Sequence, residues 1–393
     1  TITRMQLTCK TAGESHGPCG VAFIEGMPAG LTLDVDFINS ELKRRQGGYG
    51  RGGRQGIESD EILILSGVRC GVTTGAPLVL QITNKDSRLD DAVATPPIHK
   101  PRPGHADLAG SIKWLTNDCR NTLERASARE TAARTAAGAV ARCLLKEFDI
   151  EVFGFVRGML NVVAPTEITP DNWRSVRDAR DTSDTYCPDD ASCKAIIEHI
   201  RTAKENKDTV GGLCETHVFG CPPGFGSCVQ WNEKLDSKLA GAVMGIQAFK
   251  SVEIGLGATC GQLHGSKVHD PIVFDKDNRN ACHFGFTRPT NHAGGIEGGM
   301  SNGMPIVVRG TMKPIATLLQ GMNSVDLQTG EATRSDYERS DVCALPAASV
   351  VMENVVGFEI ATAFLDAFGG TTMDMVRASH NAFVSAARKI TPS

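Results

Sequence analysis

The sequence lacks the closely spaced cysteine pairs that build zinc sites and small disulfide frameworks. Its 13 cysteines are irregularly spaced and include no C-x-x-C pair, and their number is odd in a chain of 393 residues. Cys214, Cys221 and Cys228 recur every seven residues, but tetrahedral zinc sites use tighter pairs. We therefore expect buried thiols in a reducing compartment and no metal site.

Long hydrophobic runs and an excess of one charge are also missing. The apolar run at residues 342–352 is interrupted by Glu353, Asn354 and Glu359, which leaves it too short to cross a bilayer. The 41 Lys and Arg residues against 45 Asp and Glu residues give a net charge of −4, which argues against a nucleic-acid-binding protein. We expect neither a nucleic acid nor a membrane as a partner.

No linker, repeat or targeting signal is visible. No Pro-, Gly- or Ser-rich spacer or charge block divides the chain, and its 41% hydrophobic content is enough for a large core. We expect a single domain over residues 1–393, of mixed α and β structure, with a polar surface excursion at residues 166–190. Only a dozen residues precede the first motif, so we expect a cytoplasmic protein, although a removed organelle-targeting peptide would leave no trace.

Several common enzyme motifs are absent or fail their context. The chain has neither a Walker A sequence nor H-E-x-x-H. Residues 13–17 and 299–303 both match G-x-S-x-G, but a nucleophile elbow leads from a strand into a helix, and residues 13–17 precede a strand-like run at residues 21–24. Residues 48–53 match G-x-G-x-x-G but follow a polar segment rather than an apolar strand, so a Rossmann fold is not indicated.

Two glycine-containing loops do present polar side chains. Residues 13–17 place Ser15 beside His16 between glycines, which permit positive φ and close approach of a ligand to the backbone. His105 lies in a second such loop at residues 102–107. A single histidine is more often a hydrogen-bonded structural residue, but both could donate protons near neutral pH.

Basic residues gather in the same parts of the chain. Residues 43–54 contain five cations and no acid, and glycines lie between them, which suits anion capture better than a solvated helix face. Residues 127–130 fit the S-x-x-E capping box, and alanines at helical spacing follow, so we expect a buried helix from about Ser127. Its N-terminus between Arg125 and Arg129 suits a phosphate. A simple exposed pair of Glu130 with Arg134 is the alternative.

Taken together and in order, these motifs resemble the chorismate synthase family. Seven long blocks carry the resemblance and would rarely arise together by chance, whereas single motifs are weak. The blocks are residues 13–30, 44–52, 102–107, 125–134, 291–303, 313–317 and 339–346.

The resemblance implies an α+β fold of the β-α-β sandwich type, with helices between two antiparallel sheets, assembled as a homotetramer. It implies a lyase of the shikimate pathway that forms chorismate from 5-enolpyruvylshikimate 3-phosphate by 1,4-anti elimination of phosphate. The family uses reduced FMN, which supplies the electron chemistry while the protein supplies orientation and charge. NADPH is a candidate reductant.

The resemblance also implies residue roles. His16 matches the histidine that protonates the leaving phosphate, His105 the one that protonates reduced flavin, and Asp341 the carboxylate that assists flavin N5 in proton removal. The implied flavin-binding residues are Arg125, Ala126, Ser127, Gln247, Ala248, Gly298, Lys313, Pro314, Ile315, Ala316, Thr317 and Arg339. The implied ligands of substrate or NADP are Ser15, Arg44, Arg45, Arg51, Arg129 and Arg134.

Two positions depart from the family pattern. Ala316 stands where a polar or prolyl residue is usual, and His292 stands where Asn is usual. Two other functions stay open on the residues alone: a serine hydrolase using Ser15 and His16, and a non-catalytic protein that binds a phosphate ligand.

Overall fold

Alternating apolar residues build the first of two antiparallel sheets. In β6 (Leu78–Thr83), Leu80 and Ile82 are fully buried and the residues before each are only partly so, as expected for a strand with one face in the core. The computed structural model describes residues 6–52, 59–335 and 340–392, and there this sheet has the order β1-β2-β6-β3. The strand-like run at residues 21–24 lies in β2 and is confirmed. The other strands are β1 (Thr8–Ala12), β2 (Cys19–Glu25) and β3 (Ile62–Ser66).

The second sheet is also antiparallel and has the order β10-β15-β9-β7-β8. Its strands β7 and β9 are buried along most of their length. Helix α8 (Leu345–Phe368) contacts both strands, and α5 (Trp173–Thr182) contacts β7. Phe153 of β7 stacks on Phe155 and packs against Trp173 of the outer helix α5. The strands are β7 (Glu151–Met159), β8 (Val162–Val163), β9 (Gly212–Phe219), β10 (Phe249–Ile254) and β15 (Ile306–Met312).

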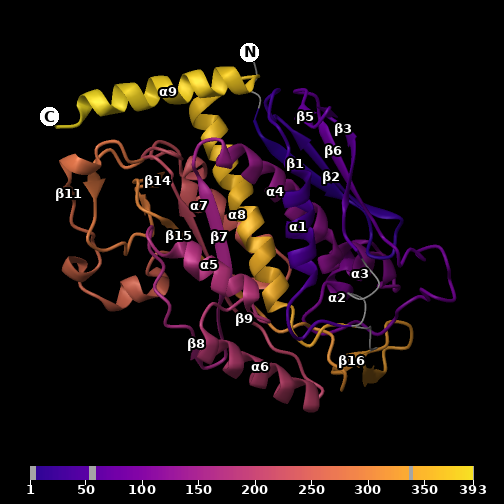
Figure 1. Ribbon diagram of the computed structural model, residues 1–393. Coiled ribbons are helices and arrows are strands. Elements are labelled where there is room, and N and C mark those ends of the chain that lie inside the picture. Colours follow the sequence, from indigo (N-terminus) through magenta and orange to yellow (C-terminus); the bar gives the residue numbers. More distant parts are fainter. Residues whose placement is uncertain (1–5, 53–58, 336–339, 393) are drawn as a thin grey trace.

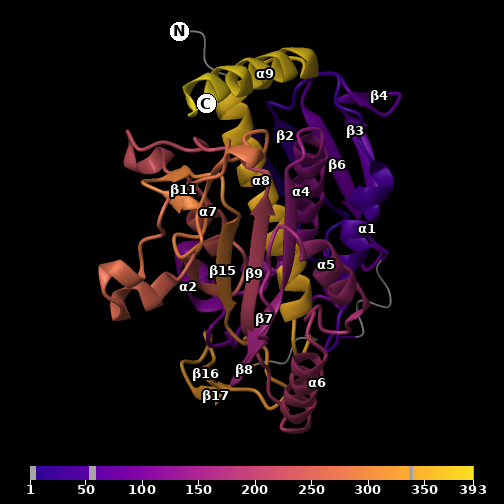
Figure 2. The ribbon, with the colours of Figure 1, turned by 60° about the vertical axis from the view of Figure 1, so that its left-hand side comes forward.

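Long apolar helices lie between the two sheets (Figures 1 and 2). Helix α4 (Thr131–Lys146) contacts β2 and β6 of the first sheet, and α8 (Leu345–Phe368) contacts β7 and β9 of the second. The Ala-rich helix expected from about Ser127 is therefore buried, and Gly138 allows it to approach α8 so closely that a Cβ there would collide with the backbone of Asn354. The predicted α+β class with antiparallel sheets is confirmed. Helices α1 (Val35–Gln46) and α7 (Leu235–Met244) complete this layer.

The apolar run at residues 342–352 lies mostly within the longer helix α8. It continues past Glu353, Asn354 and Glu359 to Phe368, and by length and mean hydropathy (1.4) it could cross a membrane. However, 89% of the 18-residue stretch of this helix that has this hydropathy is buried inside the protein. This burial is what the central helix of a folded core requires.

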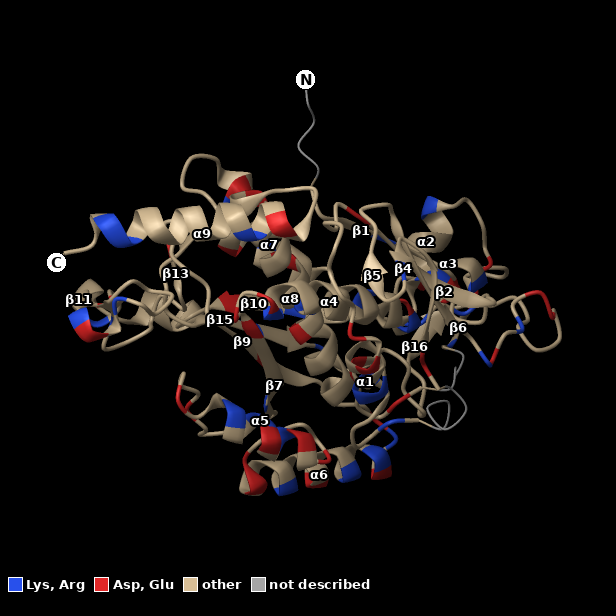
Figure 3. Ribbon diagram, turned by 45° about the horizontal axis from the view of Figure 1, so that its top comes forward, with Lys and Arg blue, Asp and Glu red and all other residues tan. Residues whose placement is uncertain are grey.

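The expected surface excursion at residues 166–190 is wrong in part. It contains α5 (Trp173–Thr182), in which Trp173 and Arg180 are buried against the second sheet. The next helix, α6 (Asp190–Glu205), does lie at the surface, and acidic and basic residues alternate along it (Figure 3). The remaining helices are α2 (Asp107–Lys113), α3 (Arg120–Ala126) and α9 (Met373–Ile390).

Short antiparallel strand pairs lie outside the two sheets. They are β4 (Val68–Arg69) with β5 (Val72–Thr73), β11 (Val273–Phe274) with β12 (Phe286–Thr287), β13 (Ile296–Glu297) with β14 (Met300–Ser301), and β16 (Asn323–Val325) with β17 (Ala332–Arg334). All 13 cysteines are free.

Candidate active site

The loop that carries Ser15 and His16 joins β1 to β2 and is fixed to α3. The backbone N–H of Ser15 donates to the carbonyl of Glu124 (3.0 Å), and that of His16 donates to the Glu124 carboxylate (2.8 Å). The imidazole Nδ1 of His16 lies 2.9 Å from Glu124 Oε1. Burial alone would raise the pKa of Glu124, but the hydrogen bonds from His16 outweigh it and hold this pKa below its ordinary value. His16 is thus held by a buried carboxylate.

The helix start after α3 differs in detail from the capping box. Ser127 caps a short 3-10 turn at Ala128–Glu130 by accepting from the backbone N–H of Arg129, and α4 begins at Thr131. The predicted start near Ser127 is confirmed, but the carboxylate of Glu130 accepts from Thr11 (2.6 Å) and Gln247 (2.9 Å). The hydroxyl of Ser127 also donates to Ser15 Oγ (3.1 Å), and this bond joins the motif blocks at residues 13–30 and 125–134.

Two of the candidate anion ligands converge on one carboxylate. Arg45 NH2 donates to Asp60 Oδ2 (2.8 Å), and Arg129 NH1 donates to Asp60 Oδ1 (2.7 Å). The three side chains are buried or nearly so. Burial alone would raise the pKa of Asp60, but Arg45 and Arg129 lower it. Arg129 also donates to Asn84 (2.6 Å), whose amide donates to the carbonyl of Gly17 (2.8 Å). Asn84 thereby connects this pair of guanidinium groups to the loop of His16.

Arg134 lies apart from this pair. Its guanidinium donates to the carbonyls of Gly245 (2.8 Å) and Ala242 (3.0 Å), at the C-terminal end of α7. These carbonyls have no partner further along the helix, so Arg134 satisfies them.

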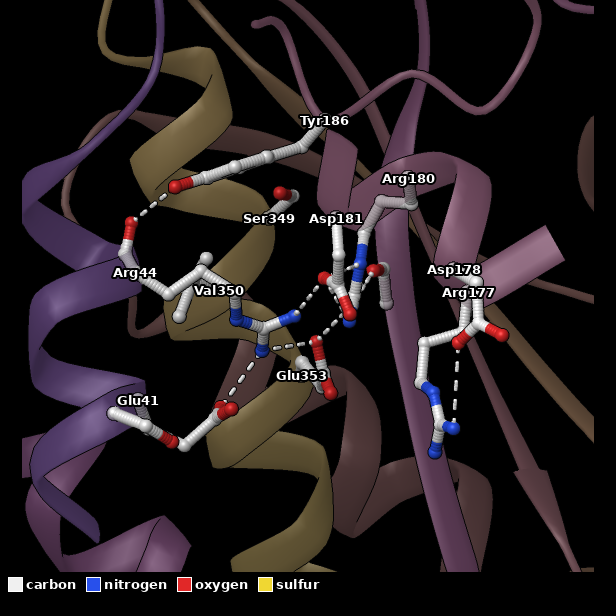
Figure 4. Close-up of polar contacts among 12 residues, drawn as sticks. Glu41, Arg44, Arg177, Asp178, Arg180, Asp181, Tyr186, Ser349, Val350 and Glu353 are labelled. Atoms are coloured by element: carbon white, nitrogen blue, oxygen red, sulfur yellow. Dashed lines mark hydrogen bonds and ion pairs between the residues drawn. The ribbon is translucent and has the colours of Figure 1, made fainter. Parts of the chain in front are cut away.

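Arg44 belongs to a different, buried charge network (Figure 4). Its NH2 lies 2.7 Å from Glu41 Oε2 and 2.6 Å from Glu353 Oε2. Arg180 and Arg142 bind the same Glu353 carboxylate at 2.9 Å each, so guanidinium groups from α1, α4 and α5 meet on one side chain of α8. Arg44 is therefore surrounded by carboxylates of its own chain.

The network makes the fold sensitive to acid. Burial alone would raise the pKa of Glu41, but Arg44 and Arg142 lower it from 4.5 to about 2. A carboxylate with a lowered pKa stabilises the folded state above its unfolded pKa. This contribution is present above pH 4.5 and is lost as the pH falls toward about 2.

Replacing Glu353 by glutamine is expected to lower the free energy of unfolding by about 3 kcal/mol, because three buried guanidinium groups lose their shared negative partner. Glutamine keeps the shape of the side chain, so the loss would report charge and not a cavity. Urea unfolding measures it. Glu198→Gln is the matched control, since it removes the exposed ion pair with Arg201 on α6 (2.8 Å) and should change the stability by less than about 1 kcal/mol. Equal stability of both variants would contradict a structural role for the network.

His105 has the same kind of partner as His16. Its Nδ1 lies 2.5 Å from Asp107 Oδ1, and the side chain of Asp107 is fully buried at the start of α2. Arg102 donates to Asp107 (2.8 Å) and to Thr317 (2.9 Å). Burial alone would raise the pKa of Asp107, but the hydrogen bonds from His105 and Arg102 hold it well below its ordinary range. Thr317, in the block at residues 313–317, is thereby joined to the loop of His105.

Residues around β10 and β15 bring further predicted site residues together. The backbone N–H of Lys313 donates to the carbonyl of Ala248 (2.9 Å), and burial lowers the pKa of the Lys313 ammonium, aided by Lys250 and Arg102. Gln247 donates its amide N–H to Glu130, while its amide oxygen is buried and has no hydrogen-bond partner among the described residues. That oxygen is a free acceptor for a ligand N–H group.

The remaining predicted flavin ligands are placed as follows. Arg125 donates to the carbonyls of Thr11 (3.0 Å) and Gly13 (3.3 Å), and Ala126 ends α3 beside it. Ile315 accepts from Thr209 (2.8 Å), Pro314 precedes it, and a Cβ at Gly104 would lie 3.8 Å from that of Ala316. Gly298 lies near the start of α7, where Gly299 accepts from Leu235, away from the end of α7 that Arg134 contacts. Arg339 lies outside the described residues.

Arg51 and Asp341 meet across the glycine-rich loop. Arg51 NH1 lies 2.6 Å from Asp341 Oδ2, and the backbone N–H of Gly52 donates to Asp341 Oδ1 (2.6 Å). The carbonyl of Gly50 accepts from Val342 and Cys343. A cavity of about 1030 Å³ opens here between residues 48–52, residues 340–342, Thr317 and the C-terminal half of α6.

Sequence reasoning missed the carboxylates Glu124, Asp107 and Asp60 and the amide of Asn84. Asp107 stands two residues after His105, and Glu124 directly precedes Arg125, so both were visible beside the motifs. Asp60 and Asn84 gave no local signal.

His292, which departs from the family pattern, donates its backbone N–H to Asp270 (2.9 Å). In the described ranges, no group of His, Cys, Asp and Glu side chains is arranged to hold a metal ion.

Comparison with known proteins places these observations in context. A family model described as chorismate synthase matches residues 7–365. The chorismate synthase of Desulforamulus reducens is 49% identical over 396 residues, which cover 97% of this chain and 99% of that protein. Chorismate synthase 1 of Bacillus cereus is 48% identical over 380 residues, covering 93% and 96%. A solved structure described as a chorismate synthase crystal structure has a TM-score of 0.80, 36% sequence identity, and coverage of 99% of this chain and 100% of that chain.

Proposed function

This chain belongs to the chorismate synthase family and is a lyase of chorismate and aromatic amino acid biosynthesis, and we propose that the candidate site performs its elimination reaction with reduced FMN. The reaction removes phosphate and a ring hydrogen from 5-enolpyruvylshikimate 3-phosphate. The observation that carries the assignment to this site is the link through Asn84, which joins the loop of His16 to the guanidinium pair of Arg45 and Arg129. A proton donor and an anion receptor are thus held side by side.

The roles of the residues follow from their positions. Arg45, Arg129 and Arg51 supply positive charge for the phosphate and carboxylates of the substrate, and Ser15 lies beside them. His16 donates a proton to the leaving phosphate, which avoids expelling a more highly charged anion. His105, held between Asp107 and Arg102, delivers a proton to the cofactor, and Asp341 assists removal of the ring hydrogen. Arg44 and Arg134 remain predicted anion ligands, and their guanidinium groups, like those of Arg45, Arg129 and Arg51, have partners within the protein.

One observation supports binding of the flavin here. A flavin ring carries N–H and carbonyl groups along one edge, and the buried amide oxygen of Gln247 has no partner within the part of the chain that the structure describes. Arg125 and Lys313 supply cations for the FMN phosphate. When bound, reduced FMN supplies the electron that makes loss of the phosphate and of a weakly acidic hydrogen feasible. We extend the flavin-binding set to Ala126, Ser127, Ala248, Gly298, residues 314–317 and Arg339, and NADPH remains the candidate reductant.

The finer architecture is part of the same proposal. Helices α4 and α8 between two antiparallel sheets support the family's β-α-β sandwich, formed as a single domain over residues 1–393. We also propose a cytoplasmic location.

A homotetramer is expected in solution. Four large apolar side chains on and after α2 are exposed, namely Leu108, Ile112, Trp114 and Leu115, and a monomer gains nothing from such exposure. Light scattering should give four times the chain mass of 41.9 kDa. Glutamate at both Trp114 and Leu115 should reduce this mass, whereas glutamate at the exposed Leu160 of another loop should not. A monomeric wild-type protein would contradict the proposal.

The function is tested by an anaerobic assay with reduced FMN and 5-enolpyruvylshikimate 3-phosphate. We expect equal amounts of chorismate and phosphate, and no turnover with oxidised FMN unless a reductant is present. A serine hydrolase would instead cleave ester substrates without flavin. A phosphate-binding protein would bind the substrate without releasing phosphate, and either result would overturn the assignment.

A further inference from the structure

Both candidate proton donors are held in the same way by buried carboxylates. The side chain of Glu124 has no exposed surface, and its Oε1 lies 2.9 Å from His16 Nδ1 and 3.5 Å from Arg120 NH1. His16 Nε2 is not in hydrogen-bond contact with the other nearby acid, since Asp86 Oδ2 is 3.9 Å away. The charged groups that face this imidazole are therefore Glu124, Asp86 and, behind Glu124, Arg120.

The second histidine repeats the pattern with unrelated chain segments. Asp107 also has no exposed side-chain surface, and it binds His105 Nδ1 on one oxygen and Arg102 Nε on the other, at 2.5 and 2.8 Å. Arg102 is the further charged group facing this ring. Its NH2 lies 3.0 Å from Nδ1 but donates to Asp107 Oδ1 (3.1 Å), so Nδ1 does not have to accept a hydrogen bond from it. In each case the histidine and an arginine from the same segment hold the pKa of the carboxylate below its ordinary value.

The 2.5 Å and 2.9 Å contacts each require a hydrogen between the two atoms. Because an ionised carboxylate can only accept, that hydrogen must reside on Nδ1. A ring that keeps its proton on Nδ1 can gain and lose its second proton only at Nε2.

We propose that Glu124 and Asp107 are positioning residues of the elimination, which fix the Nδ1–H tautomers of His16 and His105 and so make Nε2 the atom that delivers the proton. This inference rests on the function proposed above. The proposed function supplies the reaction of the two histidines, and the inference adds their tautomer. Neither carboxylate touches the substrate in this role.

Glu124→Gln and Asp107→Asn test the proposal. An amide can donate to Nδ1 and thereby shift the ring proton to Nε2, which removes the correct tautomer. We expect turnover to fall by about 10²-fold in each variant while the KM for the substrate stays within a few-fold.

The matched control is Glu215→Gln. Glu215 binds His217 at 2.7 Å in a buried pair on β9, which lies outside the candidate site. If the first two variants act only by disturbing a buried ion pair, all three should lose stability and activity alike. Wild-type turnover in Glu124→Gln and Asp107→Asn, or a higher KM with unchanged turnover, would overturn the proposal.

A direct measurement covers the case in which a variant does not fold. Nitrogen-15 NMR of the wild-type protein, with the two signals assigned from His16→Ala and His105→Ala, reports which ring nitrogen carries the proton. We expect Nδ1–H in both neutral rings, and Nε2–H would overturn the proposal. Failure of the wild-type protein to form chorismate would refute the proposed function instead, and would leave the tautomer result standing.

Discussion

The His16→Ala variant should fold but turn over roughly 10- to 1000-fold more slowly than the wild-type protein. The leaving phosphate would then depart without a positioned proton donor. The fold is expected to survive because Glu124 keeps two partners, the backbone N–H of residue 16 and Arg120. The measurement is kcat and KM with reduced FMN under anaerobic conditions. His105→Ala should fall in the same range, since it removes the proton donor to the cofactor.

His264→Ala provides the control for these two variants. His264 is exposed in a loop after β10 and has no part in the candidate site. Its removal should leave both kinetic constants unchanged. Wild-type turnover in His16→Ala and His105→Ala would show that neither imidazole transfers a proton in the slow part of the reaction.

The neighbouring arginines of α1 show what sequence can and cannot predict. Residues 43–54 were expected to capture anions because their cations lie among glycines and no acid is present. Arg44 and Arg45 are adjacent in a helix, so their side chains point about 100° apart. One therefore meets Glu353 in the core and the other meets Asp60 beside the loop of His16. Composition predicted the cluster of cations. Only the packing of the folded chain decides that Arg44 binds a carboxylate in the core and Arg45 a carboxylate beside the loop of His16.

The polar residues that interrupt the apolar run at residues 342–352 do not end helix α8, for a related reason. Charged residues normally interrupt a buried run, because an unpaired buried charge is costly. Glu353 continues the helix into the core because three arginines from other elements neutralise it. Those partners are distant in sequence, and no local pattern reveals them. The strand at residues 21–24 and the Ala-rich helix were predictable because periodicity and burial are local properties.

The Asp341→Asn variant should slow the chemical step by roughly 10²-fold or more, because an amide cannot take up the proton that is removed from C6 of the substrate ring. A substrate deuterated at C6 should then show a larger isotope effect than with the wild-type protein. The structure adds a second consequence. Both Asp341 oxygens accept hydrogen bonds, from Arg51 and from the backbone of Gly52. The amide group of asparagine would face one of these donors, so the loop should also be cleaved more rapidly by protease between residues 47 and 54.

Arg51→Lys separates the two effects. Lysine cannot reproduce the guanidinium contact with Asp341, so this variant should loosen the same loop while the carboxylate remains. Substrate and FMN should slow cleavage of the wild-type loop, because bound negative charge holds the arginine in place. If Asp341 takes part in the chemistry, the isotope effect rises in Asp341→Asn but not in Arg51→Lys. If Asp341 only closes the loop, both variants lose affinity for substrate and FMN, and their isotope effects match that of the wild-type protein.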